Sequence, residues 1–155
     1  MAAVFSVLVV SAPPPGLGGE AGGYQVKVDG RENLLRSVEL FLNRPDVGQV
    51  RVAMDEAGAE DARRRFGNHL SFSGVKVVWS TGRRADQLAA GVDGLAADAT
   101  HVVVHDAARP CVPYPDVDAL LAAAAAGADA AADGDAPTAL GVAEAATALG
   151  VAEAA

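Results

Sequence analysis

An acidic and a basic side chain stand three residues apart, directly after an apolar stretch, in the segment 105–110, HDAARP. The carboxylate of Asp106 can ligate Mg²⁺, a hard cation that prefers oxygen and usually shares its coordination shell with substrate phosphates. The guanidinium of Arg109 can bind a phosphate through two parallel hydrogen bonds. An aspartate at a strand end beside an arginine also fits an ion pair that only stabilises the fold. The segment is therefore either a metal and phosphate site or a structural pair.

Two other segments contain glycines or charged residues directly after a predicted strand. Residues 11–23, SAPPPGLGGEAGG, form a glycine-rich loop, and the backbone N–H groups of such loops can cradle phosphates. Its three consecutive prolines, however, lack three of those N–H donors. Residues 80–88, STGRRADQL, contain two arginines and an aspartate at the start of a predicted helix.

These segments must be positioned by strands and helices, which alternate along the chain. The sequence predicts strands at 4–10, 48–54, 74–79 and 100–105, and helices at 32–43, 56–66, 83–96 and from Pro115 through Leu121. Such alternation predicts right-handed crossovers and an α/β fold, a Rossmann-like, doubly wound, mainly parallel sheet with helices on both faces. Ligands of these sheets bind beyond the carboxyl ends of the strands, where the loop 11–23 and the HDAARP turn both lie.

Two of the predicted helices have specific features. Asp55 is expected to cap the N-terminus of the helix over 56–66, and Gly67 is expected to end it. The helix over 83–96 is expected to bury one stripe of apolar side chains, namely Ala85, Leu88, Ala89, Val92 and Leu95.

The segment Val104 to Pro110, VHDAARP, resembles a motif of the 2-C-methyl-D-erythritol 4-phosphate cytidylyltransferase family. In that family the motif ends a central strand, and its aspartate helps to hold the metal and the nucleotide. Arg84, Ala85 and Asp86 match the family's Arg-Ala-Asp-Ser-Val segment, with Gln87 in place of the serine. Residues 29–38 resemble its Gly-Gly-Lys-Pro-Leu-Leu segment. The resemblance extends over residues 4–121 and covers about half of a full family member.

The resemblance implies transfer of CMP from CTP to 2-C-methyl-D-erythritol 4-phosphate, with release of pyrophosphate and with Mg²⁺ as cofactor. It implies a metal site at Asp106 and a substrate-phosphate contact at Arg109. His105 is expected to pack or to hydrogen-bond locally. The nucleotide-binding residues that it implies are Ala12, Gly16, Gly18, Gly82, Arg84, Asp86, Asp106 and Ala107. A homodimer in the cytoplasm is the assembly that it favours.

The glycine-rich loop departs from the family pattern. The family has an arginine and, soon after, a lysine that neutralise the triphosphate, whereas Gly18 and Gly23 fall at these positions here. Lys27 is the nearest lysine and the remaining catalytic candidate. The family's acceptor-binding motifs do not occur after Pro110. Two alternatives therefore stay open: a catalytically degenerate homologue that serves as a nucleotide-binding or scaffold domain, and a nucleotidyltransferase for another sugar phosphate.

Composition excludes some classes of partner. The net charge of −8 makes nucleic acid an unsuitable partner. The apolar segment 4–10 is too short to span a bilayer, so no membrane association is expected. A single cysteine, Cys111, forms no intrachain disulfide and is compatible with a reducing cytoplasm; we expect its thiol to be buried.

The sequence predicts a nucleotidyltransferase-like α/β domain over residues 1–121 and an Ala-rich, low-complexity segment over 122–155. The latter contains an exact duplication, TALGVAEAA at 138–146 and again at 147–155. Two copies are too few for a repeat architecture. The segment is expected to be a helical or disordered appendage, or else its letters do not represent the natural residues.

Overall fold

The computed structural model describes residues 2–12, 23–126 and 140–144. Its strands are β1 (Phe5–Val10), β2 (Lys27–Val28), β3 (Arg31–Glu32), β4 (Val47–Asp55), β5 (Lys76–Ser80), β6 (His101–Asp106) and β7 (Leu140–Glu144). Its helices are the 3-10 turn η1 (Gly23–Gln25), α1 (Asn33–Glu39), α2 (Glu56–Phe72), α3 (Arg84–Val92) and α4 (Tyr114–Ala125).

The main sheet has the strand order β5-β4-β1-β6-β7, and its first four strands are parallel. All six residues of β1 are buried, as the continuous apolar run of a central strand requires. The register pairs Val10, the last residue of β1, with Ala53 on one side and Asp106 on the other. The Rossmann-like α/β class predicted from sequence is therefore confirmed, and Asp106 lies level with the end of the central strand.

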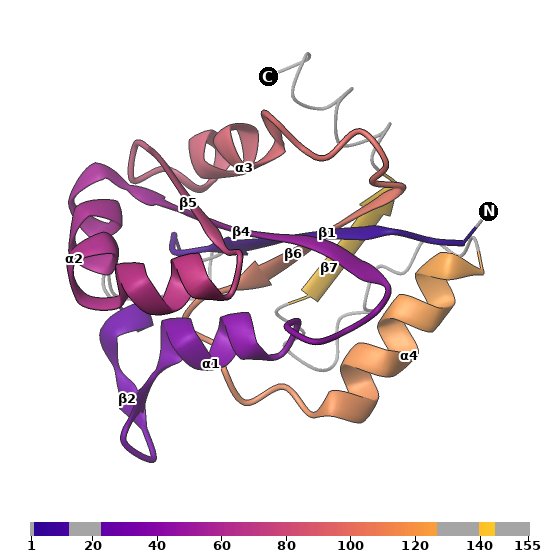
Figure 1. Ribbon diagram of the computed structural model, residues 1–155, viewed down its shortest axis with the longest axis horizontal. Coiled ribbons are helices and arrows are strands. Elements are labelled where there is room, and N and C mark those ends of the chain that lie inside the picture. The colour runs from indigo at the N-terminus through magenta and orange to yellow at the C-terminus, as the bar shows by residue number, and fades with distance from the viewer. Residues whose placement is uncertain (1, 13–22, 127–139, 145–155) are drawn as a thin grey trace.

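Helices cover both faces of this sheet (Figure 1). The larger core lies on the face covered by α1, α2 and α4, and it contains Phe5, Phe41 and Met54. The smaller core lies under α3, where Leu8 and Val102 of the sheet pack against Val92. A short β2–β3 hairpin projects beside α1, away from the sheet (Figure 1).

Helix α2 confirms one prediction and corrects another. The side chain of Asp55 accepts a 2.7 Å hydrogen bond from the N–H of Gly58, so Asp55 is the N-cap as expected. Gly67 does not end the helix, which continues to Phe72. A glycine inside a helix costs only about 1 kcal/mol. The apolar stripe on either side of Gly67, formed by Phe66 and Leu70, is buried and outweighs that cost.

The predicted inward face of α3 is confirmed at Val92, which is buried in the smaller core, but it is wrong at its two alanines. Ala85 and Ala89 are exposed, whereas Gln87 and Gly91 are buried against the sheet. The helix ends at Val92, earlier than residue 96. Gly91 allows the helix to approach closely, because a Cβ atom there would lie 2.9 Å from Leu8 Cδ1. The reason for the buried glutamine is a set of hydrogen bonds described below.

The Ala-rich segment contributes to the same sheet. Helix α4 continues through Ala125, and β7 pairs antiparallel with β6, with Leu140 opposite His105. Of the segment expected to be helical or disordered, residues 122–125 are helical, whereas residues 140–144 form a strand that pairs with the outer side of β6. Residues 127–139 and 145–155 lie outside the described part, and the domain boundary at residue 121 stays a prediction. Within the described residues, no helix is long and apolar enough to cross a membrane.

Candidate functional site

The HDAARP turn is fixed to two neighbouring elements at the carboxyl edge of the sheet. The N–H of Ala107 donates a 2.9 Å hydrogen bond to the carbonyl of Val10, so the turn continues the pairing of β6 with β1. The buried hydroxyl of Ser37, on α1, donates to the carbonyl of Ala107 at 3.1 Å. His105 is fully buried and packs edge-on against the ring of Phe41 at 5.4 Å, as expected for a packing residue. The turn is thus a rigid support for Asp106.

Asp106 is buried, with only 4% of its surface exposed, and two arginines contact its carboxylate. Arg84, at the start of α3, donates to Oδ1, and its side chain also donates to the carbonyl of Ala12 at 2.9 Å. Arg109 Nε lies 3.8 Å from Oδ2. The two positively charged arginines offset the free-energy cost of removing the carboxylate from water. This cluster joins the ends of β1 and β6 to the start of α3.

Gln87 makes a second connection between the strand ends. Its side chain is buried, and Oε1 accepts hydrogen bonds from the N–H of Ala12 at 2.9 Å and from the hydroxyl of Ser11 at 3.3 Å. Its Nε2 donates to the carbonyl of Thr81 at 3.3 Å. The carboxamide therefore bridges the loop after β1 and the loop after β5, which explains why a polar residue faces the sheet.

The loop between β5 and α3 is held by its own side chains. The hydroxyl of Thr81 donates to the carboxylate of Asp86 and accepts a 3.1 Å hydrogen bond from the N–H of Arg83. Gly82 is exposed, and a Cβ atom at this position would meet no atom within 4 Å. Gly82 and Asp86 are each two residues from Arg84 in the sequence, and the Gly82 backbone is open to solvent.

Neither Gly23, which stands at the position of the family lysine, nor Lys27, the nearest lysine, places a free cation at the carboxyl edge of the sheet. Gly23, where the family lysine falls, packs so closely on the HDAARP turn that an added Cβ would lie 3.0 Å from Ala108 Cβ. Lys27 lies on the β2–β3 hairpin, 58% exposed, with Nζ 3.6 Å from Glu32. A backbone hydrogen bond, together with the charges of Lys27 and Arg65, lowers the pKa of Glu32 below its ordinary value of 4.5. Gly16, Gly18 and the three prolines lie outside the described residues.

A Mg²⁺ ion fits this edge only in a particular coordination mode. Within residues 2–12, 23–126 and 140–144, no group of three or more Asp, Glu, His or Cys side chains is placed to hold a metal ion. Mg²⁺ is often bound by one carboxylate together with waters and substrate phosphates, and Asp106 suits this mode. Both oxygens of Asp106 face arginines, so a metal ligand role requires those arginines to move toward another anion.

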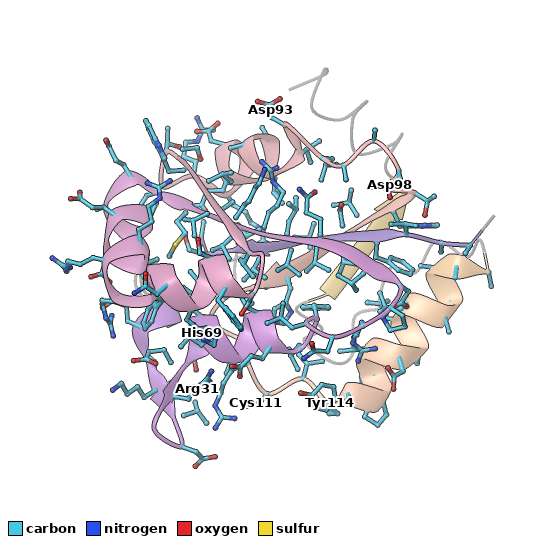
Figure 2. The ribbon with its side chains drawn as sticks, in the orientation of Figure 1. Arg31, His69, Asp93, Asp98, Cys111 and Tyr114 are labelled. Carbon is cyan, nitrogen blue, oxygen red and sulfur yellow. The ribbon has the colours of Figure 1, made fainter. Side chains whose placement is uncertain are left out.

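Ala12, Asp106 and Arg109 lie at the carboxyl edge, where the strand pattern predicts them, and Arg84, matched through the family segment alone, lies there too. The roles of these four residues stay predictions. The sequence did not indicate Ser37, Thr81 or the hydrogen bonds of Gln87, whose only signal was a glutamine at a position where the family has a serine. The prediction for Cys111 was wrong. Cys111 is a free, exposed thiol on the connection between β6 and α4, near Tyr114 (Figure 2).

Comparisons with known proteins agree with this geometry. Residues 16–146 match the family model of 2-C-methyl-D-erythritol 4-phosphate cytidylyltransferase. The enzyme of that name from Cronobacter sakazakii is 31% identical over 126 residues, which are 79% of this chain and 52% of the relative. The chain thus spans about half the length of the curated relatives it matches.

Solved structures show the same fold. The crystal structure of 4-diphosphocytidyl-2C-methyl-D-erythritol synthase from Anaerococcus prevotii superimposes with a TM-score of 0.62 at 16% identity, over 79% of this chain and 51% of that one. CMP:2-keto-3-deoxy-manno-octonic acid synthetase, complexed with CTP, superimposes with a TM-score of 0.55 at 20% identity, over 79% and 46%. The family match, the curated relative and the HDAARP edge together show that this chain belongs to the 2-C-methyl-D-erythritol 4-phosphate cytidylyltransferase family.

Proposed function

We propose that this chain transfers CMP from CTP to 2-C-methyl-D-erythritol 4-phosphate and releases pyrophosphate, with its nucleotide site at the carboxyl edge of the sheet. The observation that carries the proposal is the convergence of Arg84, Arg109 and the Ala12 backbone on Asp106 at the carboxyl edge of the sheet. Open α/β sheets bind their ligands at this edge. The family to which the chain belongs supplies the reaction class.

The residues of the edge have separate roles in this proposal. The backbone of Ala12 and the loop at Gly82 hold the base and ribose, with Asp86 fixing the loop. Arg84 binds the triphosphate of CTP, and Arg109 binds the phosphate of the acceptor, because both guanidinium groups can form paired hydrogen bonds with phosphate oxygens. In-line attack of the acceptor phosphate on the α-phosphorus of CTP then depends on how well these cations orient the two phosphates.

The arginines also determine when Asp106 can serve as a ligand. In the free chain both carboxylate oxygens face arginines. An arriving triphosphate attracts the same guanidinium groups and leaves the carboxylate available. Asp106 is the residue that would hold Mg²⁺, which when bound neutralises part of the phosphate charge. Lys27 stays the candidate for an additional cation on the hairpin, on condition that it leaves Glu32.

Release of pyrophosphate tests the proposal. We expect release from CTP, 2-C-methyl-D-erythritol 4-phosphate and Mg²⁺ with the natural chain, and loss of at least tenfold in rate, about 1.4 kcal/mol in barrier, with Asp106→Asn. Asp118→Asn is the matched control, because Asp118 also pairs with an arginine, Arg44 at 2.6 Å, but on the exposed surface of α4. Release no greater than background at high enzyme concentration would contradict the proposal.

A second function is a nucleotide-binding or scaffold domain without catalysis. The close contact of Gly23 with Ala108 and the pairing of Lys27 with Glu32 favour it, because neither position offers a ready cation for the leaving pyrophosphate. A thermal-shift panel of CTP, UTP, GTP and ATP separates the readings. Stabilisation by one nucleotide without turnover supports a binding domain, and no shift with any of them supports a scaffold.

A third function is transfer to another sugar phosphate, with residues 80–91 reading a different base. Gln87, where the family has a serine, lies in that segment. Pyrophosphate release measured with other nucleoside triphosphates and other sugar phosphates tests this function.

The family resemblance also favours a homodimer in the cytoplasm, and light scattering of the purified chain measures its oligomeric state.

A further inference from the structure

The backbone of Ala12 offers a donor and an acceptor at the point where a base is proposed to bind, and side chains of α3 occupy both. The N–H of Ala12 donates to Gln87 Oε1 at 2.9 Å, and its carbonyl accepts from Arg84 at 2.9 Å. Ala12 is itself buried, with 6% of its surface exposed. The N–H carries a single hydrogen, so a ligand that accepts from it must displace Gln87, whereas the carbonyl has a second lone pair free for a ligand.

Gln87 has the chemistry of the ligand it would exclude. A carboxamide presents a carbonyl acceptor beside an NH₂ donor, as the hydrogen-bonding edge of cytosine does. In Gln87 the acceptor receives hydrogen bonds from Ala12 and Ser11, and the donor binds the carbonyl of Thr81. These three partners lie directly after the ends of β1 and β5, on the two sides of the proposed base site.

We propose that the Gln87 carboxamide is an internal occupant of the base site, which it closes in the free chain and must leave when a pyrimidine nucleotide binds. This inference rests on the proposed nucleotide site and identifies the residue that sets its affinity for a base. Only the molecules in which the carboxamide is displaced can bind the base. The apparent association constant is therefore the intrinsic constant multiplied by the fraction of such molecules. A serine here leaves a hydroxyl and no carboxamide, and so opens the site.

The size of the effect follows from the bonds that a base must replace. The net value of an intramolecular hydrogen bond is small, and displacing Gln87 breaks three while the incoming base restores some of them. We therefore expect Gln87→Ser to tighten CTP binding about tenfold. Tripolyphosphate, which has no base, should bind the natural chain and the variant equally.

Calorimetric titration of Mg²⁺·CTP and of tripolyphosphate tests this inference. Gln49→Ser is the matched control, because Gln49 Oε1 also accepts from a backbone N–H, that of Ala96 at 3.2 Å, and from a serine hydroxyl, that of Ser6 at 3.3 Å. Ser6 and Gln49 pair near the start of β1, at the opposite edge of the sheet. The control should lose comparable stability without any gain in CTP affinity.

Gln87→Asn, which retains a shorter carboxamide, should bind CTP with intermediate affinity, and it replaces the serine variant if the latter does not fold. Tighter CTP binding by either variant, without tighter tripolyphosphate binding, supports the internal occupant. If CTP affinity is unchanged or weaker in both, Gln87 is a structural bridge and the inference is wrong, while CTP binding by the natural chain would still support the proposed function. If neither the natural chain nor the variants bind CTP, both ideas fail.

Discussion

The pair formed by Asp106 and Arg84 should be one of the stronger electrostatic contacts in the described part of the chain. Their side chains are 6% and 21% exposed, and a second arginine, Arg109, lies on the other carboxylate oxygen at 3.8 Å. The perturbation is a double-mutant cycle with Asp106→Asn, Arg84→Met and both together. These substitutions remove the charges and keep much of the volume, so the cycle isolates the interaction.

The magnitude follows from burial and bonding. A hydrogen bond to a charged group contributes about 1.5–3 kcal/mol, and partial exposure of Arg84 places this pair toward the lower end. Asp106→Asn should therefore lower the free energy of unfolding by about 2 kcal/mol. Arg84→Met should cost about as much, because it also removes the bond to the Ala12 carbonyl. The coupling free energy should be about 1.5 kcal/mol.

Urea unfolding of the four proteins, followed by circular dichroism, measures this coupling. The control cycle uses Arg44 and Asp118, whose side chains are 16% and 64% exposed, and it should give less than about 1 kcal/mol. Raising the salt concentration should weaken the control more than the buried pair, because exposed charges are screened more effectively. Effects of Asp106→Asn and Arg84→Met that add within about 0.3 kcal/mol would show that the two side chains do not stabilise each other.

Three further substitutions test the packing around the site by urea unfolding. Gly67→Ala should stabilise the chain by about 1 kcal/mol, because its Cβ enters open space in α2; destabilisation would show a crowded position. Gly91→Ala should instead destabilise by about 1 kcal/mol, because overpacking against Leu8, at 2.9 Å, exceeds the gain in helix propensity; a result equal to that at Gly67 would contradict the close approach. Asp55→Ala should cost about 1 kcal/mol through loss of the N-cap, and an unchanged midpoint would argue against that bond.

The sequence was sufficient to predict the four parallel strands of the main sheet and the position of Asp106 at its edge. The apolar runs that became β1 and β6 have few alternatives, because a short segment rich in β-branched residues and bounded by turn residues fits a buried parallel strand. The alternation of strands and helices then placed Asp106 beside the end of β1. Local chemistry also sufficed for Asp55, since an aspartate before an amphipathic stretch is a common helix cap.

The interior of the site could not be predicted in the same way. Apolar periodicity assigned Ala85 and Ala89 to the buried face of α3, but the helix buries Gln87 and Gly91 instead. Alanine gains little from burial, so a few hydrogen bonds from one glutamine and the close approach allowed by one glycine determine the rotation of the helix. The hydrogen bond from Ala12 to Gln87 joins residues 75 positions apart, and local patterns contain no information about such a contact.

The extent of helix α2 and the strand β7 were missed for related reasons. Helix α2 passes Gly67 because tertiary packing of Phe66 and Leu70 outweighs a local propensity. Residues 140–144 become a strand because β6 has an unpaired outer side, which is a property of the assembled sheet. An Ala-rich composition alone favours a helix.

The most direct test of the account is to locate bound CTP on the chain. Amide shifts in ¹⁵N-labelled protein titrated with Mg²⁺·CTP should concentrate at Ala12, at Arg83 to Gln87 and at Ala107 to Arg109, the groups that meet at the carboxyl edge of the sheet. Shifts at saturating CTP that are absent there, or that concentrate at the opposite edge near Gln49 and Ala96, would contradict a nucleotide site built on Asp106.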